Sequence, residues 1–147
     1  METVRGAVVF DLDGTLYDVT SIVHLVEGDQ RDFDAFHAAS IDCPPYAHVL
    51  EAAHAARAAG QAVIVITGRS AVWRDLTLTW FSRHDVPFDL MLMRYTDDFR
   101  PDHVVKDEFL ADIVADGYTV LEAWEDSAMV AENWRAKGIL VHDVSAT

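Results

Sequence analysis

The chain has 147 residues, of which 51% are hydrophobic, and its formal net charge is −14. This length suits one domain (1–147) with a real core, and so apolar a composition excludes a disordered chain. No apolar run approaches the ~20 residues of a membrane-spanning helix. The first residues lead directly into a predicted strand, so we expect no signal peptide. The single cysteine, Cys43, permits no internal disulfide, and we expect a cytoplasmic protein.

Strands and helices are predicted to alternate along the chain, which indicates a parallel α/β sheet. The predicted strands are 7–10, 62–66, 90–93, 119–123 and 139–142. The predicted helices are about 46–59, 71–84, one from 102 that stops at Gly117, and one from Asp126 or Ser127 to 137. Residues 17–42 are acidic and are predicted to form an irregular flap. A cap domain with its own core would need roughly 50 residues or more.

Two aspartates follow the first predicted strand. The apolar run 7–10 is typical of a strand buried on both faces of a sheet, and Asp11-Leu12-Asp13-Gly14-Thr15 comes directly after it. Residues two apart on an extended chain point the same way, so Asp11 and Asp13 are predicted to reach one site. Two close carboxylates repel each other unless a cation lies between them or one stays protonated. A divalent metal such as Mg²⁺ suits such oxygen ligands, and the pair can supply a nucleophile and a general acid/base.

Polar clusters also follow two other predicted strands. Strand 62–66 leads into Thr67-Gly68-Arg69-Ser70, and strand 119–123 leads into Trp124 and then Glu125-Asp126-Ser127. Lys106 lies early in a helix for which we predict Asp102 as the N-cap. A cation there is unfavourable to the helix macrodipole, which indicates another reason for it. Ligands of open α/β sheets bind at the carboxyl ends of the strands, where the strand order reverses. We therefore expect these side chains to meet there.

In this order, the residues resemble the four motifs of the haloacid-dehalogenase-like (HAD) phosphohydrolase superfamily: Asp11-x-Asp13-Gly14-Thr15, Thr67, Lys106 and Glu125-Asp126. The resemblance implies an α/β, HAD-like Rossmannoid three-layer sandwich. Its sheet would have five mainly parallel strands in the order 5-4-1-2-3, with no cap or a minimal one. Asp13 is typical of the phosphatases of the superfamily, because its dehalogenases lack this aspartate and its ATPases carry threonine there.

The resemblance also implies a role for each residue. Asp11 would attack phosphorus and form an aspartyl-phosphate, and Asp13 would act as general acid and then as general base. Thr67 and Lys106 would stabilise the transferring group. The implied Mg²⁺ ligands are Asp11, the backbone carbonyl of Asp13, and Asp126, with Glu125 acting through water or as a neighbouring acceptor.

A closer resemblance is to the phosphatase domain of bacteriophage polynucleotide kinase/3′-phosphatase. It rests on Ile66-Thr67-Gly68-Arg69, on the segment 102–108 that ends Lys106-Asp107-Glu108, and on the ending Trp134-Arg135-x-x-Gly138. The resemblance implies 3′-phosphate ends of DNA or RNA as the substrate. The implied substrate contacts are Gly68, Arg69, Arg100 and Asp102.

Other readings stay open at this point. The net charge of −14 argues against nucleic acid, although residues 69–106 hold six of the eleven basic residues. The alternatives are a nucleotidase-like small-molecule phosphatase and a non-catalytic module that binds a separate kinase. The chain has no Gly-x-x-x-x-Gly-Lys loop, so it carries no 5′-kinase motif, and we expect a separate kinase or ligase as a partner. Tyr17, Phe99 and Trp124 are able to stack on a base, but aromatic residues are more often core, and none is assigned to the site.

Overall fold

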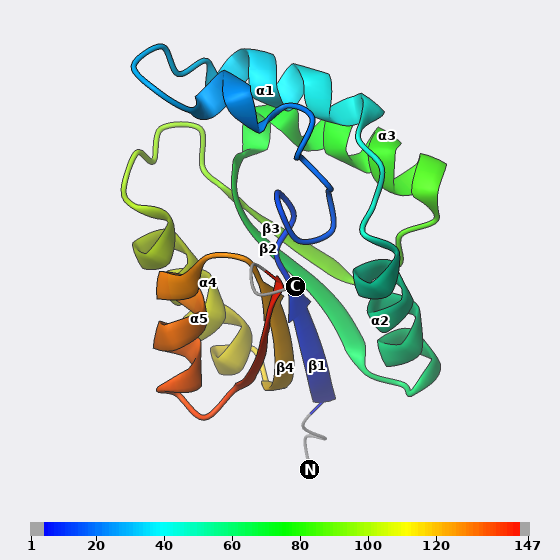
Figure 1. Cartoon of the computed structure of the whole chain (residues 1–147). Coiled ribbons are helices and arrows are strands. Elements are labelled where there is room, and N and C mark those ends of the chain that lie inside the picture. Colours follow the sequence, from blue (N-terminus) through cyan, green and yellow to red (C-terminus); the bar gives the residue numbers. More distant parts are fainter. Residues whose placement is uncertain (1–4, 145–147) are drawn as a thin grey trace.

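The computed structural model describes residues 5–144 and has a parallel sheet between two layers of helices (Figure 1). The strands are β1 (Arg5–Phe10), β2 (Ala62–Ser70), β3 (Leu90–Arg94), β4 (Tyr118–Glu125) and β5 (Leu140–Asp143). They pair in parallel in the order β3-β2-β1-β4-β5. The predicted α/β class and the strand order 5-4-1-2-3 are confirmed.

Helices cover both faces of this sheet. α2 (Ala47–Ala58) and α3 (Arg74–His84) lie on one side, and α4 (Asp102–Ala115) and α5 (Ala128–Arg135) lie on the other (Figure 1). Val8 and Phe10 of β1 belong to the core under α2 and α3, whereas Ala7 and Val9 belong to the core under α4 and α5. Burial on both faces explains why the sequence of β1 is a continuous apolar run. Within residues 5–144, no helix combines the length and the apolarity that crossing a membrane requires.

Strand β2 continues to Ser70, four residues beyond its predicted end. Its pairing with β3 passes from Thr67–Met93 to Ser70–Arg94, so Gly68 and Arg69 have no partner residue on β3. A bulge of this kind bends the strand and re-aims the side chains at its end. Residues 71–73, predicted as the first helical turn, form a separate 3₁₀ turn before α3.

The flap 17–42 contains more regular structure than predicted. It includes 3₁₀ turns at Val23–Val26 and Ser40–Asp42 and the helix α1 (Phe33–Ala39). The Asp32 carboxylate caps α1 by accepting a hydrogen bond from the Ala35 N–H at 2.9 Å, and Phe36 anchors the helix in the interior. In Figure 1, α1 lies beyond the carboxyl ends of the strands. The flap is too short to form a large cap, as predicted.

The starts of the last two helices differ in how they are capped. Of the two predicted caps of α5, Asp126 and Ser127, the cap is Ser127, because its hydroxyl accepts a hydrogen bond from the Val130 N–H. The prediction that Asp102 caps α4 is wrong. Pro101 is the N-cap, and Asp102 is the first helical residue, with its carboxylate ion-paired to Arg94. Capping by Ser127 leaves the Asp126 side chain available to the site described next.

Candidate active site

A cleft of about 780 Å³ opens at the carboxyl ends of the strands, and α1 forms part of its lining. It collects every residue that the sequence predicted for the site. These residues are Asp11, Asp13, Thr67, Gly68, Arg69, Arg100, Asp102, Lys106, Glu125 and Asp126. They come from the ends of β1, β2 and β4, from the start of α4 and from the loop before it. The strand order reverses beside β1, so the topology itself creates this meeting point.

The Asp11 carboxylate lies buried at the bottom of the cleft. One oxygen accepts a hydrogen bond from the Lys106 ammonium at 3.0 Å, and the other accepts one from the Thr15 hydroxyl at 3.1 Å. Burial acts to raise the pKa of Asp11, but the Lys106 charge and the hydrogen bonds hold it below its ordinary value. Asp11 is therefore kept ionised and oriented, as a nucleophile must be.

Lys106 is itself buried between two carboxylates. Its ammonium lies 3.0 Å from Asp11 and 2.8 Å from Glu125, and its side chain is 3% exposed. Burial alone would lower the pKa of Lys106, but the two carboxylates raise it above its usual range. The two ion pairs thus offset the unfavourable interaction of Lys106 with the helix macrodipole. Glu125 also accepts a hydrogen bond from the Ser127 N–H at 3.1 Å, so it is a fixed anchor for the lysine.

Three carboxylates crowd together beside the lysine. Oxygens of Asp11, Glu125 and Asp126 all lie within 4.8 Å of one another. Burial and the charge of Asp11 raise the pKa of Asp126 to about 9 and the pKa of Glu125 to about 7. A divalent cation relieves repulsion of this kind, so the donor set fits a metal ion. The Asp13 side chain is not part of this cluster, and its predicted metal role through the backbone carbonyl stays a prediction.

Gly14 allows the segment Asp11–Thr15 to approach Asp126 closely. Its φ is +83°, and a Cβ at this position would collide with the Asp126 carboxylate. Gly68 has a similar role on β2, because a Cβ there would collide with the carboxylate of Asp102. Both glycines thus permit close approach to an acidic side chain. The predicted substrate contact of Gly68 stays a prediction.

Asp13 faces Arg69 instead of the metal cluster. The two side chains form a two-point ion pair, with Nη2 to Oδ1 at 2.5 Å and Nε to Oδ2 at 3.3 Å. The remaining guanidinium donors bind the hydroxyls of Ser40 at 3.0 Å and Thr77 at 3.1 Å. Burial acts to lower the pKa of Arg69, but Asp13 raises it, so the cation persists.

This geometry gives Arg69 a second role. Its side chain is fully buried, although the residue lines the cleft. Its guanidinium donors are engaged by Asp13, Ser40 and Thr77, and its predicted substrate contact stays a prediction. The structure favours a role in which Arg69 orients the Asp13 carboxylate. Asp13 remains partly exposed, as a residue that exchanges protons with a substrate must be.

Arg100 and Asp102, the other predicted substrate contacts, are also engaged in ion pairs. Arg100 binds Asp98 at 2.8 Å and Glu108 at 2.7 Å, and Asp102 binds Arg94. Arg100 is half-exposed and borders the cleft, so its substrate contact stays a prediction. Thr67 is buried, and its hydroxyl accepts a hydrogen bond from the Arg69 N–H at 3.0 Å.

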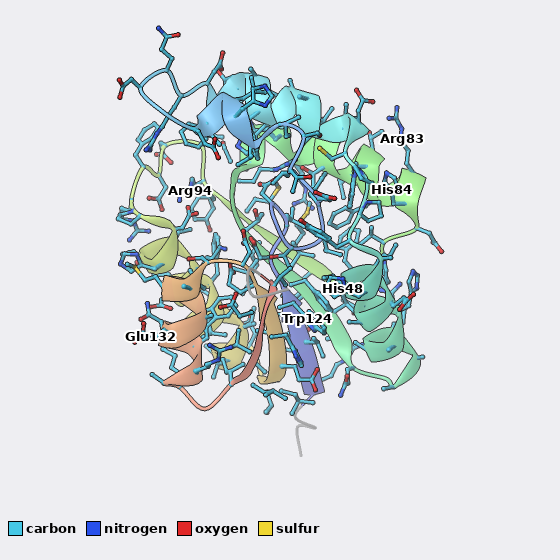
Figure 2. All side chains as sticks on the ribbon, in the orientation of Figure 1. His48, Arg83, His84, Arg94, Trp124 and Glu132 are labelled. Carbon is cyan, nitrogen blue, oxygen red and sulfur yellow. The ribbon has the colours of Figure 1, made fainter. Side chains whose placement is uncertain are left out.

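Sequence reasoning missed several residues that hold the site together. Arg94, which is labelled in Figure 2, donates hydrogen bonds to the carbonyls of Gly68, Asp98 and Arg100, and it thereby ties the end of β2 to the loop before α4. Ser40 and Thr77 bind Arg69. No sequence pattern identifies these residues, because they act through contacts between segments that are distant in the sequence.

Two kinds of comparison relate the chain to known proteins. The family model for the phosphatase domain of polynucleotide kinase PNKP, a domain of the HAD type, matches residues 5–147. Comparison with curated proteins returns no match. Among solved structures, the chain resembles two of the Pnkp1/Rnl/Hen1 complex, the second of them described as an RNA repair complex.

The match to these complexes covers nearly all of this chain. Identities are 26% and 25%, TM-scores are 0.80 and 0.81, and 97% and 95% of this chain is covered. The chain spans only 47% and 42% of the matched chains. A class C acid phosphatase from Bacillus anthracis, solved with tungstate, shares the fold at 14% identity and a TM-score of 0.66, over 85% of this chain and 53% of that one.

Proposed function

Because the chain belongs to the family of HAD-type phosphatase domains of polynucleotide kinase PNKP, we propose that it is a Mg²⁺-dependent phosphomonoesterase that removes 3′-phosphates from polynucleotide ends. The observation that carries the chemistry is the buried Asp11 carboxylate, held by Lys106 beside the acidic cluster. The family match and the likeness to Pnkp1 carry the choice of substrate. The absence of a large cap leaves the cleft accessible to the end of a polymer.

The reaction has two steps. Asp11 attacks phosphorus and forms an aspartyl-phosphate, while Asp13 protonates the departing 3′-oxygen. Asp13 then takes a proton from water, which attacks phosphorus and releases inorganic phosphate and free Asp11. Lys106 and the Thr67 hydroxyl stabilise the negative charge of the transferring group. A Mg²⁺ held by Asp11, Asp126 and the Asp13 carbonyl would supply further positive charge against the phosphate oxygens.

We also propose that the protein works beside enzymes that act on the same ends. Removal of a 3′-phosphate leaves a 3′-hydroxyl, which is the group that end joining requires. The Pnkp1 chains extend well beyond the matched region, and their complex contains Rnl and Hen1. A kinase or ligase, separate from this chain, is the partner that this arrangement supports.

A substrate panel tests the proposed function. We expect hydrolysis of 3′-phosphate oligonucleotides, in RNA or DNA form, in preference to 5′-phosphate oligonucleotides and mononucleotides. EDTA should abolish the activity, and added Mg²⁺ should restore it, because the carboxylate cluster needs its cation. Released phosphate is the readout. If mononucleotides outcompete the oligonucleotides, the protein is a small-molecule phosphatase, and full activity in EDTA would contradict the metal-dependent mechanism.

The role of Asp13 predicts a dependence on the leaving group. Asp13→Asn removes the proton that the departing oxygen needs, and a poor leaving group needs it most. The variant should therefore lose more activity on alkyl phosphates than on p-nitrophenyl phosphate. Initial rates on both substrates, measured at saturating Mg²⁺, give the ratio. Equal losses on the two substrates would make Asp13 only a structural residue.

A further inference from the structure

Exposed apolar side chains gather at the mouth of the catalytic cleft. Phe99, in the loop between β3 and α4, is 88% exposed, and Phe33, at the start of α1, is 54% exposed. Val72, in the turn before α3, is 68% exposed, and all three residues line the cleft. Single exposed apolar residues are ordinary. Three of them from separate segments, on one cleft that already holds the reactive groups, indicate a ligand with an apolar part.

The three aromatic residues that the sequence analysis considered for base stacking lie in different environments. Tyr17 is fully buried, with its ring stacked on Trp80 at 3.7 Å between centroids. Trp124 stacks on His142 at 4.2 Å and does not line the cleft, and Figure 2 shows it beside His48, well away from Arg94. Only Phe99 of the three is exposed to the cleft.

Phe99 is presented by a fixed backbone. The Arg94 guanidinium donates hydrogen bonds to the carbonyl of Asp98 at 3.0 Å and to the carbonyl of Arg100 at 2.6 Å. The Asp98 carboxylate in turn accepts hydrogen bonds from the backbone and the side chain of Arg100. The residues on both sides of Phe99 are thus held, while its ring is free. Because the backbone around Phe99 is already fixed, little backbone freedom is lost when the ring binds a ligand.

Phe33 is held in a similar way from the other segment. It follows the Asp32 cap of α1, and Phe36, one turn later on the same face of the helix, is buried in the interior. Ser40, just after the helix, accepts a hydrogen bond from Arg69 at 3.0 Å, and Arg69 holds Asp13. The position of Phe33 is therefore fixed relative to the reacting groups.

We propose that Phe33 and Phe99, here called the stacking pair, bind the nucleobase next to the scissile 3′-phosphate and make the enzyme select unpaired ends. The proposal rests on the function proposed above. With the phosphate at Asp11, the attached nucleoside extends toward the mouth of the cleft, where the pair lies. Every base has a flat π-face, so stacking tolerates any sequence. The terminal base of a duplex is stacked on the neighbouring base pair, so it cannot offer both of its faces while it stays paired, and single-stranded or frayed ends are preferred.

The kinetic test removes either the ring or the base. The substrates are single-stranded 3′-phosphate oligonucleotides with a normal or an abasic terminal nucleotide. Phe33→Ala and Phe99→Ala should each lower kcat/KM on the normal end by about five- to hundredfold, and leave the abasic end nearly unchanged. Tyr95→Ala is the matched control, because Tyr95 is an exposed aromatic residue of the same loop that does not line the cleft. It should affect neither substrate.

A binding test keeps the stacking pair separate from catalysis. In the Asp11→Asn protein, a 3′-phosphate oligonucleotide ending in 2-aminopurine should lose fluorescence when its base stacks on the pair. Phe99→Ala in the same background should remove this quenching. If no phosphomonoester is hydrolysed but the quenching is present, the proposed function fails and the stacking pair stands.

Three outcomes overturn the stacking pair itself. Equal losses of kcat/KM on normal and abasic ends, with no fluorescence quenching, show that the rings only shape the cleft. A phosphotyrosyl peptide that is hydrolysed better than any oligonucleotide, with the larger loss in Phe99→Ala, assigns the pair to a protein substrate. A preference for blunt duplex ends over single strands also contradicts the proposal.

Discussion

Replacing Asp11 with Asn is expected to lower kcat by at least about a thousandfold while the fold is kept. The amide has the shape of the carboxylate but cannot attack phosphorus, so no aspartyl-phosphate forms. Lys106 keeps its 2.8 Å contact with Glu125, and the repulsion between Asp11 and Asp126 disappears. Loss of the 3.0 Å ion pair between Lys106 and Asp11 destabilises the fold and loss of the repulsion stabilises it, so the two changes oppose each other in the free energy of unfolding. Released phosphate and a thermal melt measure the two effects.

The exposed Asp112 of α4 provides the matched control for this variant. Asp112→Asn changes the charge by the same amount outside the cleft, and it should alter neither kcat nor the melting temperature appreciably. Substantial turnover by Asp11→Asn would assign the nucleophile to another group. An unfolded Asp11→Asn protein would show that the carboxylate is mainly structural.

The site residues that lie at the ends of strands were predictable from the sequence. Asp11, Thr67 and Glu125-Asp126 each come directly after or at the end of a strand, and parallel topology brings such positions together whatever the side-chain details. The strand order 5-4-1-2-3 was implied by the resemblance to the HAD superfamily. β1 and β2 are apolar on both faces, so these strands could be predicted from the sequence itself. The helix α1 could not, because it is short and its stability depends on Phe36 packing into the interior and not on a periodic pattern.

The partners of the charged side chains were much less predictable. Asp102 has the residue type and position of an N-cap, but Pro101 takes that place, and the carboxylate pairs with Arg94 instead. The substrate contact predicted for Arg69 was implied by the resemblance to the phage phosphatase domain. The bulge in β2, and hydroxyls from two other segments, place its guanidinium in the interior. Such choices depend on which donors and acceptors become neighbours after folding, and local sequence carries little of that information.

The buried environment of Arg69 gives the second large expected effect. Arg69→Met should lower the free energy of unfolding by about 2–4 kcal/mol, because the variant leaves Asp13 without its cation and the Ser40 and Thr77 hydroxyl oxygens without their donor. Asp13 is 23% exposed, so water reduces the penalty. Urea unfolding measures the loss. Arg100→Met is the control. The ion pairs of Arg100 are solvent-exposed, so this variant should leave the urea midpoint nearly unchanged.

If Arg69 acts by orienting Asp13, its loss must also have the kinetic pattern of Asp13→Asn. Arg69→Met should then lose more activity on alkyl phosphates than on p-nitrophenyl phosphate. The double variant should be little worse than Asp13→Asn alone, because both changes disable the same proton transfer. A stable Arg69→Met protein that loses activity only on oligonucleotides would reverse this assignment. In that case the arginine contacts the polymer, and the ion pair with Asp13 must open when substrate binds.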